Sequence, residues 1–267
     1  MTVAIIGAGV MGETLLSGLL RAGRRPDELL VGEKRRERAH ELQERYGVEV
    51  VSNTDAAGKA DTLVLVVKPQ DMADVLEELA PVVRPGQLVV SLAAGITTAF
   101  IEARLPDEVA VVRVMPNTPA LVDEGMAAIS RGSHCDESHL AEAEALMAST
   151  GKVIRVPERQ QDAVTAISGS GPGYIFFVVE SMIEAGVHLG LPRSVASELV
   201  VQTVVGSAKL LRDTAEHPVV LRERVTSPGG TTAAALRELE DHKVRAAFLG
   251  AIEAARDRSR ALAEGMD

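Results

Sequence analysis

The start of the chain carries a glycine-rich turn of the kind that binds phosphate groups. An apolar run, Val3–Ile6, leads into Gly7, Ala8, Gly9, Val10, Met11 and Gly12, and an apolar helical pattern follows. In a strand–GxGxxG–helix unit the first glycine permits the tight turn, the second lets the backbone approach a pyrophosphate, and the third lets helix and strand pack closely. The unpaired N–H groups of the helix N-terminus then face the phosphates. The pattern predicts a dinucleotide site, against the alternative of a glycine-rich turn that binds nothing.

The residues after the second predicted strand bear on which ribose this site accepts. Glu33 lies 21 residues past Gly12, where an acid would hold a free 2′-hydroxyl. Lys34, Arg35 and Arg36 follow at once, and their charges could hold a 2′-phosphate. Because three adjacent bases outnumber one acid, we expect NADPH to be preferred, with NADH possible. The alternative is that the basic run is the solvated start of a helix.

Three further predicted strands end in segments that could contact the same cofactor. Ligands of open α/β sheets bind at the carboxyl ends of the strands. Asn117 lies between two prolines, and its amide could meet a carboxamide in a rigid loop. The alternative for each segment is an ordinary turn, since proline ends strands in any case. The cofactor contacts expected at these ends are Val67, Lys68, Pro69, Ala94, Gly95 and Asn117.

A second glycine turn, in the C-terminal half, could hold a small carboxylate. Gly229 and Gly230 stand at the start of a predicted helix, where they can present bare N–H groups to an anion. Thr231 and Thr232 add hydroxyl groups on the same turn. The alternative is that both threonines only cap the helix. A serine- and glycine-rich segment around Ser170 precedes another predicted helix and is the second candidate for substrate contacts.

The elements that must position these residues fall into two parts. Short β-branched runs alternate with helical patterns up to Pro157, which is typical of a doubly wound parallel sheet. After Pro157 the period is helical throughout. We therefore predict an α/β fold with a Rossmann-type doubly wound parallel sheet in residues 1–157 and an all-helical domain in residues 158–267. The predicted strands are Val3–Ile6, Leu29–Gly32, Leu63–Val67, Leu88–Ser91 and Val109–Val114, with two edge runs flanking a helix at Ser138–Ala148. The predicted helices of the second domain are Gly173–Gly190, Arg193–Arg212, Pro218–Val225, Thr231–Glu240 and Lys243–Glu264.

Two of those helices, Gly173–Gly190 and Arg193–Arg212, are apolar around most of their circumference. A helix of this kind must be buried nearly all round. About 110 residues cannot enclose two such helices alone, on surface-to-volume grounds. The second domain is therefore expected to form a homodimer that buries both helices.

Composition and charge exclude several other classes of protein. The formal net charge of −10 leaves no uniform basic face for nucleic acid or anionic lipid. The longest uncharged stretch contains several glycines and a proline and cannot span a membrane. Cys135 is the single cysteine, so no intrachain disulfide forms, and we expect a cytoplasmic protein. His134, Cys135 and His139 suggest a polar loop rather than a metal site, because a fourth ligand is not apparent.

These motifs stand in the order and spacing of a known family. The sequence strongly resembles pyrroline-5-carboxylate reductases through GAGVMG, VVKPQ, SLAAGIT, RVMPNTPALV, DAVTAISGSGPGY, GSAKLL, EHP and VTSPGGTTAAALRELE. The resemblance covers the whole chain, and its SPGGTT segment is close to diagnostic.

This resemblance implies an NADPH-binding domain followed by a helical domain that interlocks in a dimer, assembled further into a ring of dimers. It implies reduction of the cyclic imine 1-pyrroline-5-carboxylate to L-proline. By position, Asn53 and Lys68 resemble the family's cofactor contacts, and Glu158 and Thr232 its substrate-side residues. We expect Thr232 to be the catalytic contact to the substrate nitrogen. Gly173, where the family commonly has alanine, and Arg224, where we expect a neutral residue, depart from the family's pattern.

Two alternatives keep the dinucleotide turn but not this reaction. A β-hydroxyacid-type dehydrogenase shares the GxGxMG turn and a helical second domain, but it needs a catalytic lysine in the second domain. Lys209 and Lys243 are the only lysines after Lys152, and neither stands in a glycine-rich context. A non-catalytic NADP(H) sensor would have no reason to keep the second glycine turn.

Overall fold

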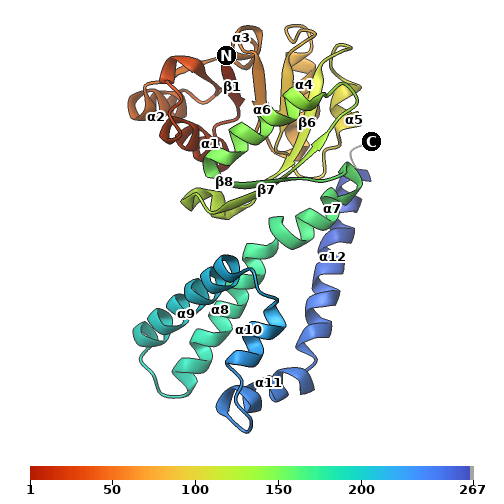
Figure 1. Cartoon of the computed structure of the whole chain (residues 1–267). Coiled ribbons are helices and arrows are strands. Elements are labelled where there is room, and N and C mark those ends of the chain that lie inside the picture. The colour runs from red at the N-terminus through yellow and green to blue at the C-terminus, as the bar shows by residue number, and fades with distance from the viewer. Residues whose placement is uncertain (265–267) are drawn as a thin grey trace. The chain divides into compact units, whose positions relative to one another are not determined.

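The computed structural model describes residues 1–264, and the chain forms two compact units. Among the described residues, unit 1 comprises residues 1–170 and 255–264, and unit 2 comprises Gly171–Ala254. Unit 1 contains the sheet, and unit 2 is helical (Figure 1). The boundary predicted at Pro157 separates the sheet from the helices in sequence, whereas packing places residues 158–170 with the sheet.

Unit 1 is built on one eight-stranded sheet with the order β3-β2-β1-β4-β5-β6-β7-β8. Strands β1 to β6 are parallel, β7 runs antiparallel to β6, and β8 runs parallel to β7. The strand order reverses next to β1, as in doubly wound sheets, and the glycine turn follows β1 at that point. The strands are β1 Val3–Ile6, β2 Leu29–Gly32, β3 Glu49–Val51, β4 Thr62–Leu65, β5 Leu88–Ser91, β6 Ala110–Met115, β7 Gly125–Arg131 and β8 Gly151–Arg155.

The predicted parallel sheet is confirmed, with one strand added. Each predicted strand begins and ends within two residues of the observed one. The edge runs are β7 and β8, and the helix between them is α6. Strand β3 is missing from the prediction because three residues at a sheet edge are too few to show a period.

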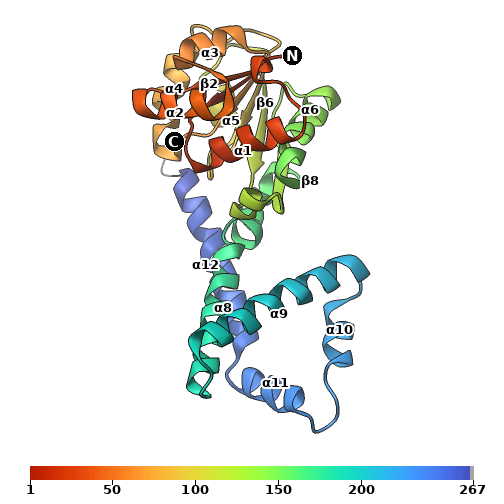
Figure 2. The same cartoon turned by 90° about the vertical axis from the view of Figure 1, so that its left-hand side faces the viewer.

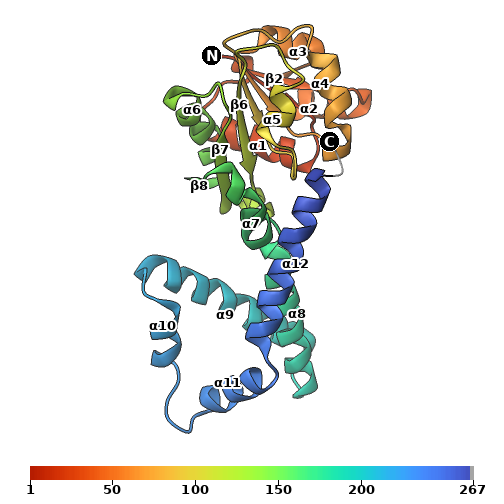
Figure 3. The same ribbon diagram turned by 90° about the vertical axis from the view of Figure 1, so that its right-hand side faces the viewer.

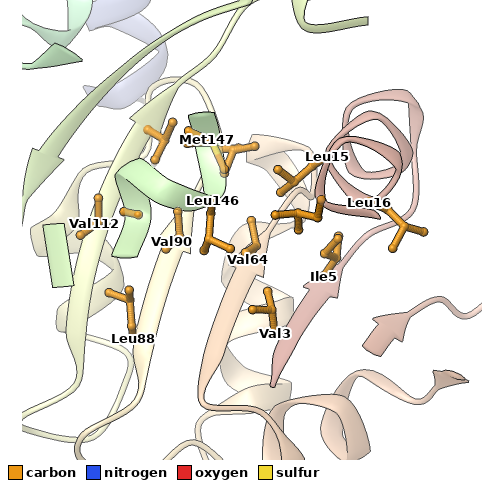
Figure 4. Close-up of a cluster of buried hydrophobic side chains, with 14 of the residues drawn as sticks. Val3, Ile5, Leu15, Leu16, Val64, Leu88, Val90, Val112, Leu146 and Met147 are labelled. Carbon is orange, nitrogen blue, oxygen red and sulfur yellow. The ribbon is translucent and has the colours of Figure 1, made fainter. Parts of the chain in front are cut away.

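Helices cover both faces of the sheet and create two apolar layers. One layer packs α1, α2 and α6 against the sheet, and the other packs α3, α4 and α5. Figure 4 shows the first layer, in which Leu15 and Leu16 of α1 and Leu146 and Met147 of α6 meet strand residues such as Val64. Because both faces are covered, the strands are buried apolar runs rather than alternating ones. The helices are α1 Val10–Arg21, α2 Arg36–Tyr46, α3 Asn53–Lys59, α4 Met72–Leu79, α5 Thr98–Glu102 and α6 Glu137–Met147.

Unit 1 ends in a helical segment that leads to unit 2. The short helix α7, Gln161–Val164, continues directly into one π-helical turn, Thr165–Gly169. The C-terminal part of helix α12, Val244–Glu264, packs beside α7, where Ser259 donates a hydrogen bond to Asp162 (Figure 3).

Unit 2 contains helices whose apolar side chains are mostly exposed in the single chain. Its helices are α8 Gly171–His188, α9 Arg193–Thr214, α10 Pro218–Arg224 and α11 Thr231–Asp241, together with the part of α12 up to Ala254. Helices α8 and α9 pack against each other (Figure 2), yet only Ala196 and Val200 are buried among the unit's apolar residues. Each helix begins and ends within two residues of its prediction. By length and composition alone, α9 could cross a membrane, and within residues 1–264 it is the one helix that meets that test.

Candidate active site

The glycine turn after β1 has the geometry that its three glycines demand. Gly7 has φ +99°, and a Cβ there would come 2.7 Å from the carbonyl oxygen of Val66. A Cβ on Gly12 would come 2.1 Å from the carbonyl oxygen of Gly7, so only glycine permits this close packing. Gly9 is the N-cap of α1, and a Cβ built on it would meet nothing within 4 Å. The turn can therefore receive a phosphate group on the N-terminus of a 12-residue helix. Ala8 is buried, Met11 is partly buried and Val10 is exposed.

Glu33 is bound to the turn and to Arg35 rather than free. Its carboxylate accepts hydrogen bonds from the backbone N–H, Nε and Nη2 of Arg35 at 2.9, 3.1 and 3.0 Å. It also accepts a hydrogen bond from the backbone N–H of Ala8. Burial alone raises the pKa of the Glu33 carboxyl, but these hydrogen bonds and the charge of Arg35 outweigh it and lower the pKa. The acid expected at the ribose is thus ionised and paired with a base.

A second acid, Glu78 on α4, neutralises the next base along the chain. Its Oε2 accepts hydrogen bonds from Lys34 Nζ at 2.9 Å and from Asn53 Nδ2 at 3.2 Å. Asn53 is buried against Gly32, where a Cβ would come 2.6 Å from its Oδ1. Arg36, the first residue of α2, is exposed and forms no ion pair within the described part of the chain. Glu78, which approaches from 44 residues away, thus adds a second acid beside the three bases.

The other predicted cofactor contacts lie at the carboxyl ends of β4 and β5. Val67 is partly buried, and exposed Lys68 is the N-cap of the 3₁₀ turn Pro69–Asp71. Ala94 is partly buried, and Gly95 has φ +80°. Since β1, β4, β5 and β6 are parallel, these residues and the glycine turn share one edge of the sheet.

Asn117 lies at the same edge after β6, but its amide is already in use. Its Oδ1 accepts the backbone N–H of Met126 at 2.8 Å, and its Nδ2 donates to the carbonyl and hydroxyl oxygens of Ser168 at 3.3 and 3.2 Å. The expectation of an amide free to meet a carboxamide has to be corrected. Ser170, the predicted substrate residue, closes the π-turn by donating its N–H to the carbonyl of Thr165 at 2.8 Å.

Glu158 binds two residues of unit 1. Its carboxylate accepts hydrogen bonds from the backbone N–H and hydroxyl of Thr98 at 2.8 and 2.7 Å, at the start of α5. It also faces the buried Arg113 guanidinium, with 3.4 Å between Oε1 and Nη1. These contacts give Glu158 a structural role, and its role toward substrate stays a prediction.

The second glycine turn opens α11 in unit 2. Gly229 has φ +69°, and Gly230 is the N-cap. The N–H of Gly230 is bonded to the carbonyl of Ser227 at 3.0 Å, so the expectation that it is bare was wrong. The first-turn N–H groups are instead those of Thr231 and Thr232. Neither threonine caps α11, because the cap position belongs to Gly230.

The two residues that depart from the family's pattern, Gly173 and Arg224, both fit their surroundings. A Cβ on Gly173 would meet nothing within 4 Å, so the alanine expected there would fit. Arg224, at the end of α10, forms an ion pair with Glu216 at 2.7 Å. The basic side chain is thus balanced by the acid of the EHP segment.

The residues that suggested a polar loop have local structural roles. Cys135 is buried and its thiol donates to the carbonyl of Val111 at 3.0 Å, and burial raises the pKa of this thiol. His139 Nδ1 accepts the backbone N–H of Asp136 at the start of α6. A group of three or more metal-ligating side chains is not found in residues 1–264.

Sequence reasoning missed Glu78 and a network around Arg38. The Arg38 guanidinium donates to the carbonyl of Ala8 at 3.2 Å and to Glu13, which also binds Arg45 and Tyr46. The spacing of these residues along the chain gave no signal, because α2 and α4 reach the glycine turn only through the folding of the sheet.

Comparisons with known proteins cover the whole chain. A family model described as pyrroline-5-carboxylate reductase dimerisation matches residues 158–262, and one described as NADP oxidoreductase, coenzyme F420-dependent, matches residues 2–95. The chain is 44% identical over 265 residues to pyrroline-5-carboxylate reductase from Corynebacterium melassecola, covering 98% of each chain. The structure of a pyrroline-5-carboxylate reductase from Coxiella burnetii aligns with a TM-score of 0.93 at 38% identity, and pyrroline carboxylate reductase from Plasmodium falciparum with NADP bound aligns with 0.88 at 29%; each covers 98% of both chains.

Proposed function

The chain belongs to the pyrroline-5-carboxylate reductase family, and we propose that it reduces 1-pyrroline-5-carboxylate to L-proline with NADPH. The observation that carries this proposal is full-length similarity, with 44% identity over 98% of both chains. The matched region spans the positions of both glycine turns and is not confined to the dinucleotide half. The proposed reaction is the last step of proline biosynthesis.

The residues of unit 1 fit a dinucleotide at the carboxyl edge of the sheet. Gly9 leaves open space at the N-terminus of α1, and steric contacts require glycine at Gly7 and Gly12. We propose that the turn binds the pyrophosphate and that Arg36, with Lys34 and Arg35 beside it, faces the 2′-phosphate. Asn53, Lys68 and the ends of β4 and β5 complete the proposed contacts. The NADP in the Plasmodium falciparum relative supports this choice of cofactor.

The proposed reaction depends more on the orientation of the substrate than on acid–base catalysis. The imine carbon accepts a hydride, the electron pair of the C=N bond moves onto nitrogen, and the nitrogen is protonated. When bound, NADPH supplies the hydride. The first-turn N–H groups of α11 hold the substrate carboxylate, and the Thr232 hydroxyl orients the nitrogen. Glu158 and Ser170 remain proposed substrate-side residues, and the α11 turn replaces Gly230 as the principal anion contact.

The assembly follows from the exposed apolar faces of unit 2. Apolar side chains exposed on both helices, among them Phe177 of α8 and Leu199 of α9, are typical of an interaction surface. The dimerisation model covers α8 to α12, which supports a homodimer in which a second copy buries α8 and α9. We propose that dimers assemble further into a ring and that the enzyme works in the cytoplasm, where the buried Cys135 thiol would stay reduced.

The test is a steady-state assay of NADPH oxidation at 340 nm with the imine as substrate, with proline identified as the product. We expect turnover that depends on both substrates. The matched controls are an assay with NADPH but without imine and an assay with a β-hydroxyacid and NADP⁺, in which NADP⁺ reduction is followed. Reduction of NADP⁺ by the hydroxyacid, without reduction of the imine by NADPH, would favour the dehydrogenase alternative, and NADPH binding without turnover would favour the sensor.

A further inference from the structure

Asn117 joins two segments of unit 1 that lie 51 residues apart in the sequence. Its oxygen is held by the N–H of Met126 at the start of β7, which fixes the orientation of the amide. Its nitrogen therefore points at Ser168 and donates to both the carbonyl and the hydroxyl of that residue. An amide anchored on one side and donating on the other is a link between the sheet and the helical segment.

Pro172 explains why the Ser168 carbonyl needs a donor from outside its own helix. In an α-helix the carbonyl of Ser168 would accept the N–H of the residue four positions on. That residue is Pro172, which has no N–H. A partly buried carbonyl left without a donor costs free energy, so a donor from elsewhere is favoured. Asn117 Nδ2 is that donor.

The linked segment is a single π-helical turn, Thr165–Gly169, closed by the hydrogen bond from Ser170 N–H to the Thr165 carbonyl. Such turns are rare and are frequently found at functional sites. Ser168 lies inside the turn and Ser170 directly after it. Asn117 itself follows β6, at the same sheet edge as the glycine turn.

We propose that Asn117 is a positioning residue for imine reduction: it holds the π-turn at the carboxyl edge of the sheet and so sets the place of Ser170. This inference rests on the proposed function and assigns Asn117 a task different from contact with the cofactor. Asn117 acts on the substrate through Ser168 and Ser170, so its loss lowers the use of imine more than the binding of NADPH.

The decisive variant is Asn117→Asp, which separates the two halves of the link. The aspartate keeps an acceptor for the Met126 N–H but places an oxygen against the Ser168 carbonyl. We expect kcat/KM for the imine to fall roughly 10- to 100-fold, with the NADPH dissociation constant changed less than about threefold. Ser168→Ala keeps the main-chain carbonyl and should cost less than about threefold. Because both residues act in one link, Asn117→Ala and Asn117→Ala/Ser168→Ala should lose about the same activity.

A stability control separates positioning from a general weakening of the fold. Gln87 is buried before β5, where it donates to the carbonyls of Ala57 and Ala60 and accepts the N–H of Arg84. This is the amino edge of the sheet. Gln87→Met should lower Tm yet leave kcat/KM for the imine within about twofold below Tm, as expected for a site away from the chemistry.

Hydrogen–deuterium exchange of residues 165–170 supplies a readout that needs no activity. We expect these amides to exchange faster in Asn117→Asp than in the wild type, while residues 3–6 are unchanged. Unchanged exchange, unchanged imine kinetics, or an equal loss in NADPH affinity would each overturn the positioning role. A wild-type enzyme that does not reduce the imine refutes the proposed function instead, and the exchange data still decide whether the link exists.

Discussion

The two units of this chain treat apolar side chains in opposite ways. In unit 1 the central strands are completely buried, with Val3 and Ile5 at 0% exposure. In unit 2 the apolar side chains of α8 and α9 face outward, and Phe177 is 70% exposed. Both units have sequences that fold into regular elements at the predicted places. The difference shows that unit 1 contains its own core, whereas unit 2 supplies half of a core that a second copy completes.

The largest effect is expected from a variant that places a charge on the exposed apolar face of unit 2. Leu199 on α9 is 55% exposed in the single chain, and Leu121 in unit 1 is 54% exposed. Leu199→Asp should bury an unpaired charge on each side of a two-fold interface, at a cost of about 3–5 kcal/mol per charge. We expect loss of the dimer in light scattering and loss of activity.

The matched variant Leu121→Asp should stay dimeric, because it leaves the faces of α8 and α9 untouched. An active, folded monomer of the wild type at micromolar concentration would contradict the account of unit 2.

A second prediction concerns the steric demand inside unit 1. Gly12→Ala drives a Cβ into the carbonyl oxygen of Gly7, which is main chain and cannot rotate away. We expect a fall in the free energy of unfolding of more than about 2 kcal/mol and loss of NADPH binding. Gly9→Ala should keep the wild-type Tm, because its Cβ meets open space, but should weaken NADPH binding. Thermal denaturation and a fluorescence titration of NADPH measure the two effects, and equal losses of stability would show that the turn is sterically uniform.

The third prediction tests chemistry at the turn in unit 2. Thr232→Val removes the hydroxyl and keeps the volume. We expect kcat/KM for the imine to fall roughly 30- to 150-fold, equivalent to about 2–3 kcal/mol of transition-state stabilisation. NADPH affinity should be nearly unchanged, because the proposed phosphate contacts belong to unit 1. Thr231→Val is the control, and we expect at most a small effect from it. Full activity of Thr232→Val in a destabilised protein would return the threonine to a structural role.

A smaller effect is expected at the ribose end of the cofactor site. Arg36 pairs with no acid among residues 1–264, so Arg36→Ala should lower kcat/KM for NADPH roughly fivefold, the scale of an exposed charge interaction of about 1 kcal/mol. The value for NADH should not change. Arg35→Ala frees the Glu33 carboxylate, so the preference should move toward NADH. Equal effects of Arg36→Ala on both cofactors would remove this residue from the 2′-phosphate site.

The smallest effect is a pH dependence in unit 1. Burial raises the pKa of Glu13, but hydrogen bonds from Arg38 and Tyr46 and the charges of Arg38 and Arg45 lower it below its ordinary 4.5. A carboxyl with a lowered pKa stabilises the folded state above its ordinary pKa, and this stabilisation is lost as pH falls through the lowered value. Tm of the wild type should therefore fall more steeply below about pH 4.5 than Tm of Glu13→Gln. Glu77→Gln, an exposed control on α4, should keep the wild-type slope.

The sequence by itself determined the order of the elements and the places of the two glycine turns. Both depend on local rules: hydrophobic period, the φ of Gly7, and the close packing that Gly12 permits. The apolar circumference of α9 likewise predicted a face that needs a partner.

Only the tertiary structure decided which side chains are free to act. Glu78 reaches Lys34 and Asn53 across the sheet edge, and Asn117 reaches Ser168 over 51 residues. These pairings form because parallel strands bring their carboxyl ends together. The spacing of residues along the sequence does not reveal which strands become neighbours. Gly230 shows the same limit within a single turn, because its N–H bonds Ser227 once the loop closes. Local propensity sets where a helix starts, but the folding of the chain sets which donors and acceptors remain for a ligand.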